Sequence, residues 1–70
     1  MRYVYVIERA KDGSYSAYVP DLPGCTTSGE SVDEVKANIG DAVALYVDAL
    51  RENGDIIPPP TSVTDVVDAA

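Results

Sequence analysis

The chain has 70 residues, of which twelve are acidic and five basic, giving a net charge of −7, with one cysteine and no histidine. This size allows one domain with a thin core that needs self-association or a partner, and the composition excludes an intramolecular disulfide and argues against structural zinc. The acidic excess disfavours direct nucleic-acid binding and favours a basic protein partner, although solubility alone would also account for it.

The N-terminal segment, residues 2–8, is rich in β-branched and aromatic side chains and predicts a strand. It carries no signal-peptide pattern, and no stretch of about 18 apolar residues is present to span a membrane. The free Cys25 suits a reducing compartment. We therefore expect a cytoplasmic protein with no membrane contact.

A hairpin is predicted next, with Ala10–Ser14 as its loop and Gly13 in the left-handed position. This loop pairs Ile7 with Ala17 and Tyr5 with Val19. The face toward the core would carry Tyr3, Tyr5, Ile7, Tyr15, Ala17 and Val19. The other face would present three apolar side chains through which we expect at least a dimer to form, namely Val4, Val6 and Tyr18.

The segment Val19–Cys25 reads as a strand end followed by a rigid turn. Pro20 has no N–H and so ends strand pairing. Pro23 and Gly24 fit the central positions of a type II turn, in which the second residue needs a positive φ. A short third strand is predicted over residues 25–28.

The longest predicted element is a helix from Val32 to Asn53, with Gly54 just beyond its end. Ser31 and Glu34 have the spacing of a capping box. We expect the apolar stripe to pack on the hairpin. Gly40, at the edge of the stripe, would either permit a close approach of the helix to the sheet or simply be tolerated there. The stripe consists of Val32, Val35, Ile39, Ala42, Val43, Tyr46, Val47 and Leu50.

An acidic stripe is predicted on the same helix, because Glu34, Asp41 and Asp48 recur at seven-residue spacing with Glu52 beside them. None of these residues has a lysine four positions later to neutralise it. A merely solvated helix usually mixes the two signs of charge. The stripe is therefore either a docking face for a basic partner or an ordinary solvated surface.

The segment Asp55–Ile57 predicts a brief fourth strand, ended by Pro58–Pro60, that returns parallel to the first strand. The predicted fold is an α+β two-layer domain with the element order β-β-β-α-β and the sheet order 3-2-1-4. Residues 1–60 would form the domain. Residues 61–70 would be a tail, either frayed or docked.

The sequence offers no obvious catalytic or metal-binding group. Histidine, on which triads and general-base pairs usually rest, is absent, and no basic residue neighbours Cys25 in sequence to lower its pKa. The acidic residues around the turn and the helix start lack the spacing of a calcium loop. We expect no catalytic, cofactor-binding or metal site, and a residual metal-dependent nuclease is the weakest alternative.

The string Val19-Pro-Asp-Leu-Pro-Gly-Cys25, followed by Gly29, Ser31 and Glu34, resembles the signature of HicB-like antitoxins. Further matching positions are Tyr3–Ile7, Asp12, Gly13, Tyr15, Ala17, Asn38 and Ala42. The resemblance covers residues 1–60. It implies a partial ribonuclease H-like fold and neutralisation of a HicA-like toxin, a small basic protein that cleaves mRNA with a histidine.

The resemblance gives the acidic stripe and the turn a role in covering the active surface of such a toxin. The partner-binding candidates are Asp21, Leu22, Pro23, Gly24, Glu34, Asp41, Asp48 and Glu52. A stand-alone oligomeric binding or scaffold domain without a toxin is the alternative. Many HicB proteins also carry a DNA-binding segment, but residues 61–70 contain no Lys or Arg, so we expect no DNA-mediated autoregulation by this chain alone.

Overall fold

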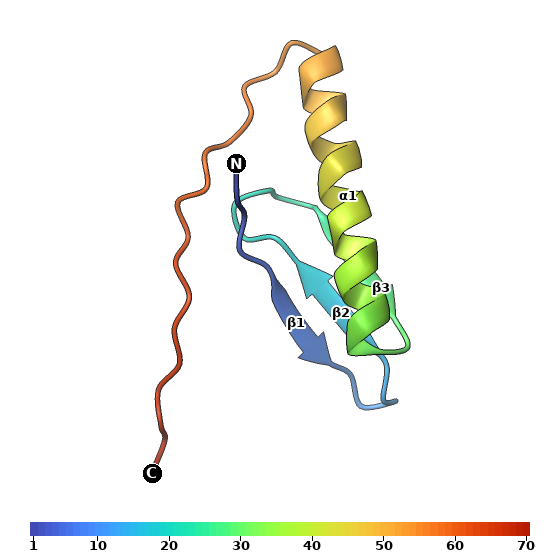
Figure 1. The fold of residues 1–70 in the computed structure, drawn as a ribbon, viewed down its shortest axis with the longest axis vertical. Coiled ribbons are helices and arrows are strands. Elements are labelled where there is room, and N and C mark those ends of the chain that lie inside the picture. Colours follow the sequence, from blue (N-terminus) through green and yellow to red (C-terminus); the bar gives the residue numbers. More distant parts are fainter.

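A computed structural model describes all residues 1–70 and contains one antiparallel sheet with one long helix across it (Figure 1). The strands are β1 (Val6–Arg9), β2 (Tyr15–Tyr18) and β3 (Thr26–Gly29), in the sheet order β1-β2-β3. The helix is α1 (Val32–Glu52). The predicted α+β class is therefore confirmed. No helix is both long and apolar enough to cross a bilayer.

The β1–β2 hairpin has the predicted register, with Ile7 opposite Ala17. Gly13 has a φ of +89°, and the Ala10 N–H donates to the Ser14 carbonyl over 2.9 Å, so the turn also forms as predicted. The first strand is shorter than predicted, however, and residues 2–5 lie outside it. The residues that would pair with them lie in the loop after β2. The chain turns away from β1 there, so the ladder cannot continue.

The loop between β2 and β3 consists of two successive turns that insert one side chain into the core. The Leu22 N–H donates to the Val19 carbonyl over 3.1 Å, and the Cys25 N–H donates to the Leu22 carbonyl over 3.0 Å. Gly24 has a φ of +80°, as the predicted Pro23–Gly24 turn requires. Leu22, held between the two turns, is completely buried.

Both ends of α1 are capped by nearby side chains and backbone groups. The Ser31 Oγ accepts from the Glu34 N–H over 3.1 Å, as predicted. The Glu34 carboxylate accepts from the Glu30 N–H over 3.2 Å, one residue earlier than a strict capping box would place it. The helix ends at Glu52, and Gly54 follows with a φ of +71°.

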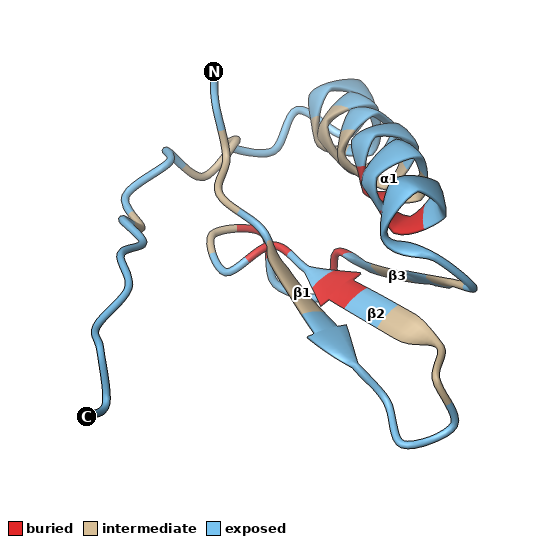
Figure 2. Ribbon diagram, turned by 60° about the horizontal axis from the view of Figure 1, so that its bottom comes forward, coloured by how far each residue is buried: buried red, intermediate tan, exposed pale blue.

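The core lies between the sheet and the first half of α1 (Figure 2). Its six buried residues are Ala17, Val19, Leu22, Cys25, Val35 and Ile39. Half-buried side chains pack around them, namely Tyr3, Ile7, Tyr15, Ala42, Val43, Tyr46 and Val47. Tyr5 and Val32, both predicted in the core, are more than a third exposed. A Cβ on Gly40 would meet nothing within 4 Å, so the predicted close approach there is wrong.

The predicted fourth strand is absent, because residues 55–57 join no ladder and the sheet has three strands. The order 3-2-1-4 and the ribonuclease H-like arrangement are therefore not seen. Pro58–Pro60 have no N–H to donate, and the contact that fixes this segment comes from the Tyr3 hydroxyl, which donates to the Pro58 carbonyl. Residues 63–70 then run extended and away from the body (Figure 1).

Candidate partner-binding surface

The outer face of α1, defined here by Glu34, Asp41, Asp48 and Glu52, lies on the side of the helix opposite the buried core residues. Glu34 is at its edge nearest the sheet, because its carboxylate reaches back to the Glu30 N–H and its side chain lies beside Gly29 at the end of β3. At roughly 100° per residue, Asp41 and Asp48 lie about 160° and 180° around the helix axis from the buried Ile39. All four acidic residues are exposed. The sequence pattern therefore becomes a row of exposed acidic residues along α1. Figure 2 shows that the side of α1 turned away from the sheet is exposed.

The charges on this outer face are little compensated within the chain. The one ion pair of the chain joins Asp48 to Arg51, three positions later, over 3.7 Å, and both side chains are 65% exposed. Such an exposed pair contributes little to stability. Glu34 takes part in the helix cap, whereas Asp41 and Glu52 form no ion pair. The face can thus meet a basic surface without first breaking strong internal contacts.

Leu45 adds an exposed apolar residue at the edge of the outer face, which the sequence analysis missed. Its side chain is 72% exposed, and it lies one helical turn from Asp41 and Asp48. A signal was present, since Leu45 is the large aliphatic residue of the helix that lies outside the apolar stripe. An apolar residue surrounded by charged ones is the usual anatomy of a protein interface.

The turn Asp21–Gly24 lies apart from the outer face. The Tyr46 hydroxyl donates to the Pro23 carbonyl over 2.8 Å, and Tyr46 projects from the side of α1 that packs on the core. Pro23 and Gly24 are exposed, but Leu22 is fully buried and serves the core. The structure therefore does not bring the turn and the acidic stripe into one patch.

Asp21 holds the C-terminal segment to the body. Its carboxylate accepts hydrogen bonds from the Thr61 N–H (3.0 Å) and Oγ1 (3.1 Å), and from the Ser62 N–H (2.9 Å) and Oγ (2.8 Å). These bonds, led by the one from the Ser62 N–H, lower the pKa of Asp21. No local pattern could have shown this contact, because its two sides are forty positions apart in the chain.

The three residues predicted to mediate self-association are only partly exposed on the outer side of the sheet. Tyr18 is 41% exposed, while Val4 and Val6 are half-buried. The apolar patch is therefore smaller than the sequence predicts. Association of two copies through it stays a prediction.

The structure provides no grouping of three or more His, Cys, Asp or Glu side chains that could hold a metal ion. Burial raises the pKa of the Cys25 thiol, which favours its protonated and unreactive form. Two shallow hollows of about 270 and 210 Å³ lie between the N-terminal segment and α1. Both are smaller than the roughly 300–1,000 Å³ typical of small-molecule sites.

Comparison with known proteins agrees with the resemblance read from the turn and the helix cap. Residues 3–70 match the family model of the HicB-like antitoxin of bacterial toxin-antitoxin systems. A UPF0150 protein of Thermoplasma acidophilum is 38% identical over 58 residues, which cover 83% of this chain and 84% of that protein. A UPF0150 protein of Archaeoglobus fulgidus is 39% identical over 59 residues, covering 81% and 86%.

Two further similarities concern proteins whose names state an antitoxin role. The antitoxin HicB of Escherichia coli is 33% identical over 61 residues, which cover 87% of this chain but 44% of that longer protein. A chain of the solved HicA3–HicB3 toxin-antitoxin complex superposes with a TM-score of 0.71 at 26% identity, covering 86% of this chain and 70% of that chain. The chain described here belongs to the HicB-like antitoxin family.

Proposed function

We propose that this chain binds and neutralises a small, basic, HicA-like mRNA-cleaving toxin by covering its active surface. Membership of the HicB-like family and the likeness to a toxin-antitoxin complex support this function. The observation that carries it furthest is the acidic outer face of α1, which is exposed and barely paired within the chain. The proposed action is non-catalytic and takes place in the cytoplasm, where free thiols stay reduced.

The outer face is the proposed centre of the toxin contact. A basic toxin surface would be attracted by Asp41, Asp48 and Glu52, and Leu45 would supply the desolvated apolar contact between them. Pro23 and Gly24, exposed on the turn that lies apart from the outer face, would form a second, smaller contact. Because most of the attraction is electrostatic, we expect affinity to fall as salt concentration rises.

Co-expression tests the proposed function directly. The small basic protein encoded beside this chain should arrest growth when expressed alone, and co-expression of this chain should restore growth and intact mRNA. The two proteins should also co-purify. If the neighbour is harmless, or if it is toxic but never bound, the antitoxin function fails, and a self-associating scaffold domain becomes the better description.

Charge reversal then tests the proposed surface. The double variant Asp41→Lys and Glu52→Lys should raise the dissociation constant for the toxin at least about tenfold and flatten its salt dependence. The matched control, Asp65→Lys with Asp68→Lys, changes the net charge equally on the C-terminal segment and should alter affinity much less. Equal losses from both variants would show that only the overall charge matters.

A further inference from the structure

The C-terminal segment carries the three most exposed large hydrophobic residues of the chain. Val63, Val66 and Val67 are 91%, 93% and 90% exposed, against 41% for Tyr18 on the outer side of the sheet. These valines lie on an extended stretch that contacts no strand and no helix (Figure 1). Extended apolar valines of this kind have strong β-propensity and gain stability when a sheet covers them.

The sheet of the same chain has a free edge that could accept such a stretch. β1 is the terminal strand of the sheet, so the backbone groups on its outer side have no ladder partner. The helix packs mainly on β2 and β3 and leaves this edge open. A five-residue stretch spans about 17 Å at roughly 3.3 Å per residue, enough to cover the four-residue β1.

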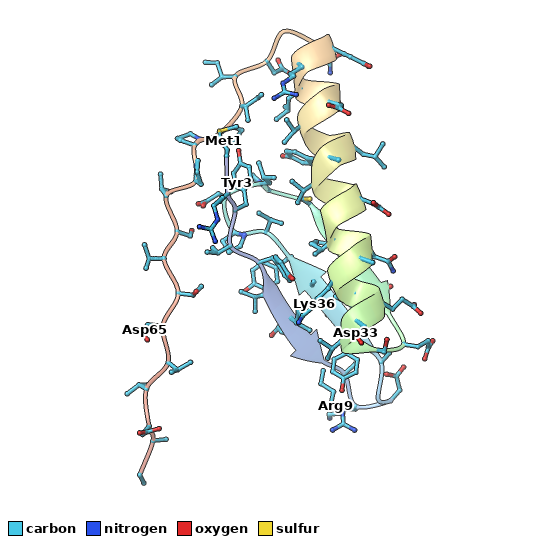
Figure 3. The ribbon with its side chains drawn as sticks, viewed as in Figure 1. Met1, Tyr3, Arg9, Asp33, Lys36 and Asp65 are labelled. Carbon is cyan, nitrogen blue, oxygen red and sulfur yellow. The ribbon has the colours of Figure 1, made fainter.

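The charges on the two elements are complementary. Arg9 is the last residue of β1, next to Glu8, and Arg2 and Lys11 flank the strand. Arg2, Arg9 and Lys11 account for three of the five basic residues of the chain, and none of them forms an ion pair. The C-terminal segment carries Asp65 and Asp68 and no basic residue after Arg51. Asp65 and Arg9 nevertheless lie well apart within one chain (Figure 3).

The direction of the segment points to a second copy as its partner. Asp21 fixes the point where the segment leaves the body, and from there the segment runs toward the same end of the molecule as β1 but turns away from it (Figures 1 and 2). A two-fold axis perpendicular to the strands reverses that direction, so the segment of a second copy would meet β1 antiparallel. Antiparallel pairing is the more stable of the two arrangements.

We propose that residues 63–67 of one copy add to the free edge of β1 of a second copy, reciprocally, and so form a strand-exchanged dimer. The exchange covers the exposed valines and pairs the open edge, and the antiparallel register that places Asp65 opposite Arg9 brings these two opposite charges together. It differs from association through the Val4, Val6 and Tyr18 patch, which uses the outer face of the sheet and leaves the C-terminal segment free.

Sedimentation measurements on variants test the dimer. A chain ending at Ser62 should be monomeric where the full chain is dimeric, and Asp65→Lys with Asp68→Lys should raise the dimer dissociation constant about tenfold or more. The matched control Asp41→Lys with Glu52→Lys carries the same change in net charge on α1 and should leave the dimer unchanged. A dimer that survives removal of residues 63–70 would overturn the proposal.

Mixed samples identify the acceptor edge. Isotope-labelled wild-type chain is mixed with unlabelled chain carrying a spin label on Val66→Cys, and wild-type chain treated with the same reagent controls for labelling at the buried Cys25. The proposal requires paramagnetic broadening of the β1 amides, Val6–Arg9. Broadening confined to residues 63–70 would instead show that the two C-terminal segments pair with each other. A monomeric wild-type chain would show that the segment binds no second copy. Either result rejects the proposal.

Discussion

The first half of the molecule and its last third differ in how their apolar residues are used. Every fully buried side chain lies between Ala17 and Ile39, within β2, the double turn and the start of α1. The C-terminal half of α1 has no fully buried residue, because its apolar side chains are half-buried or, like Leu45, exposed. Beyond it, Ile56, Val63, Val66 and Val67 are about nine-tenths exposed.

This difference assigns stability to the first region and makes the second available for recognition. Burial of apolar surface is the main source of stability, so the region between Ala17 and Ile39 holds the fold together. The remainder can change with smaller consequences for folding and is free to contact other molecules. The acidic outer face and the C-terminal segment, on which both proposals rest, lie mainly in that second region.

Replacing one leucine in each region should give the largest difference in stability between the two regions. Leu22→Ala leaves a cavity at a completely buried site and should cost about 2–5 kcal/mol of unfolding free energy, enough to unfold much of a domain this small. Leu45→Ala, at a site that is 72% exposed, should change stability by no more than about 0.5 kcal/mol and should weaken toxin binding instead. Chemical denaturation measures both stabilities. Similar losses for the two variants would mean that burial does not separate the regions.

Two glycine substitutions should shift stability in opposite directions. Gly24→Ala forces a φ of +80° on a residue with a Cβ and should destabilise the double turn by about 1–2 kcal/mol. Gly40→Ala should stabilise the chain by up to about 1 kcal/mol, because it lies within α1 and its new Cβ would meet nothing within 4 Å. Thermal unfolding measures both. A destabilised Gly40→Ala variant would reveal a hidden need for glycine there.

The patch on the outer side of the sheet should have a smaller effect on association than the C-terminal segment. Tyr18→Lys places a charge on the most exposed member of the patch and leaves residues 63–67 untouched. If strand exchange forms the dimer, this variant should stay dimeric with a stability within about 0.5 kcal/mol of wild type. Sedimentation checks the assembly. A monomeric Tyr18→Lys variant would show that the dimer forms through the Val4, Val6 and Tyr18 patch instead.

The smallest expected effect concerns pH and the contact at Asp21. The pKa of Asp21 is lowered chiefly by the Ser62 N–H, so its ionised form favours docking. The contribution is therefore present above the ordinary carboxyl pKa and is lost as pH falls below about 4 through the lowered value. NMR shifts of the Thr61 and Ser62 amides should follow this loss. Asp21→Asn should show the undocked shifts at neutral pH. Shifts equal to those of the wild-type chain would mean that the carboxylate does not hold the segment.

Local interactions made several features readable from the sequence by itself. The hairpin register depends on a loop of few residues around Gly13, the turn on Pro23 and Gly24, and the helix start on Ser31 and Glu34. Each is decided by groups within a few positions of one another, so residue type and spacing were sufficient. The charged outer face of α1 was readable for the same reason, because helical geometry alone places its residues together.

Only the tertiary structure decided where the chain goes after the helix. The sequence favoured a fourth strand beside β1, but the proline run cannot donate to a ladder, and Asp21 instead holds Thr61 and Ser62 from forty positions away. The burial of Leu22 and the exposure of Leu45 likewise depend on which elements pack together. Which distant parts of the chain come into contact depends on all the contacts available in the whole molecule. Local residue preferences alone therefore cannot predict these contacts.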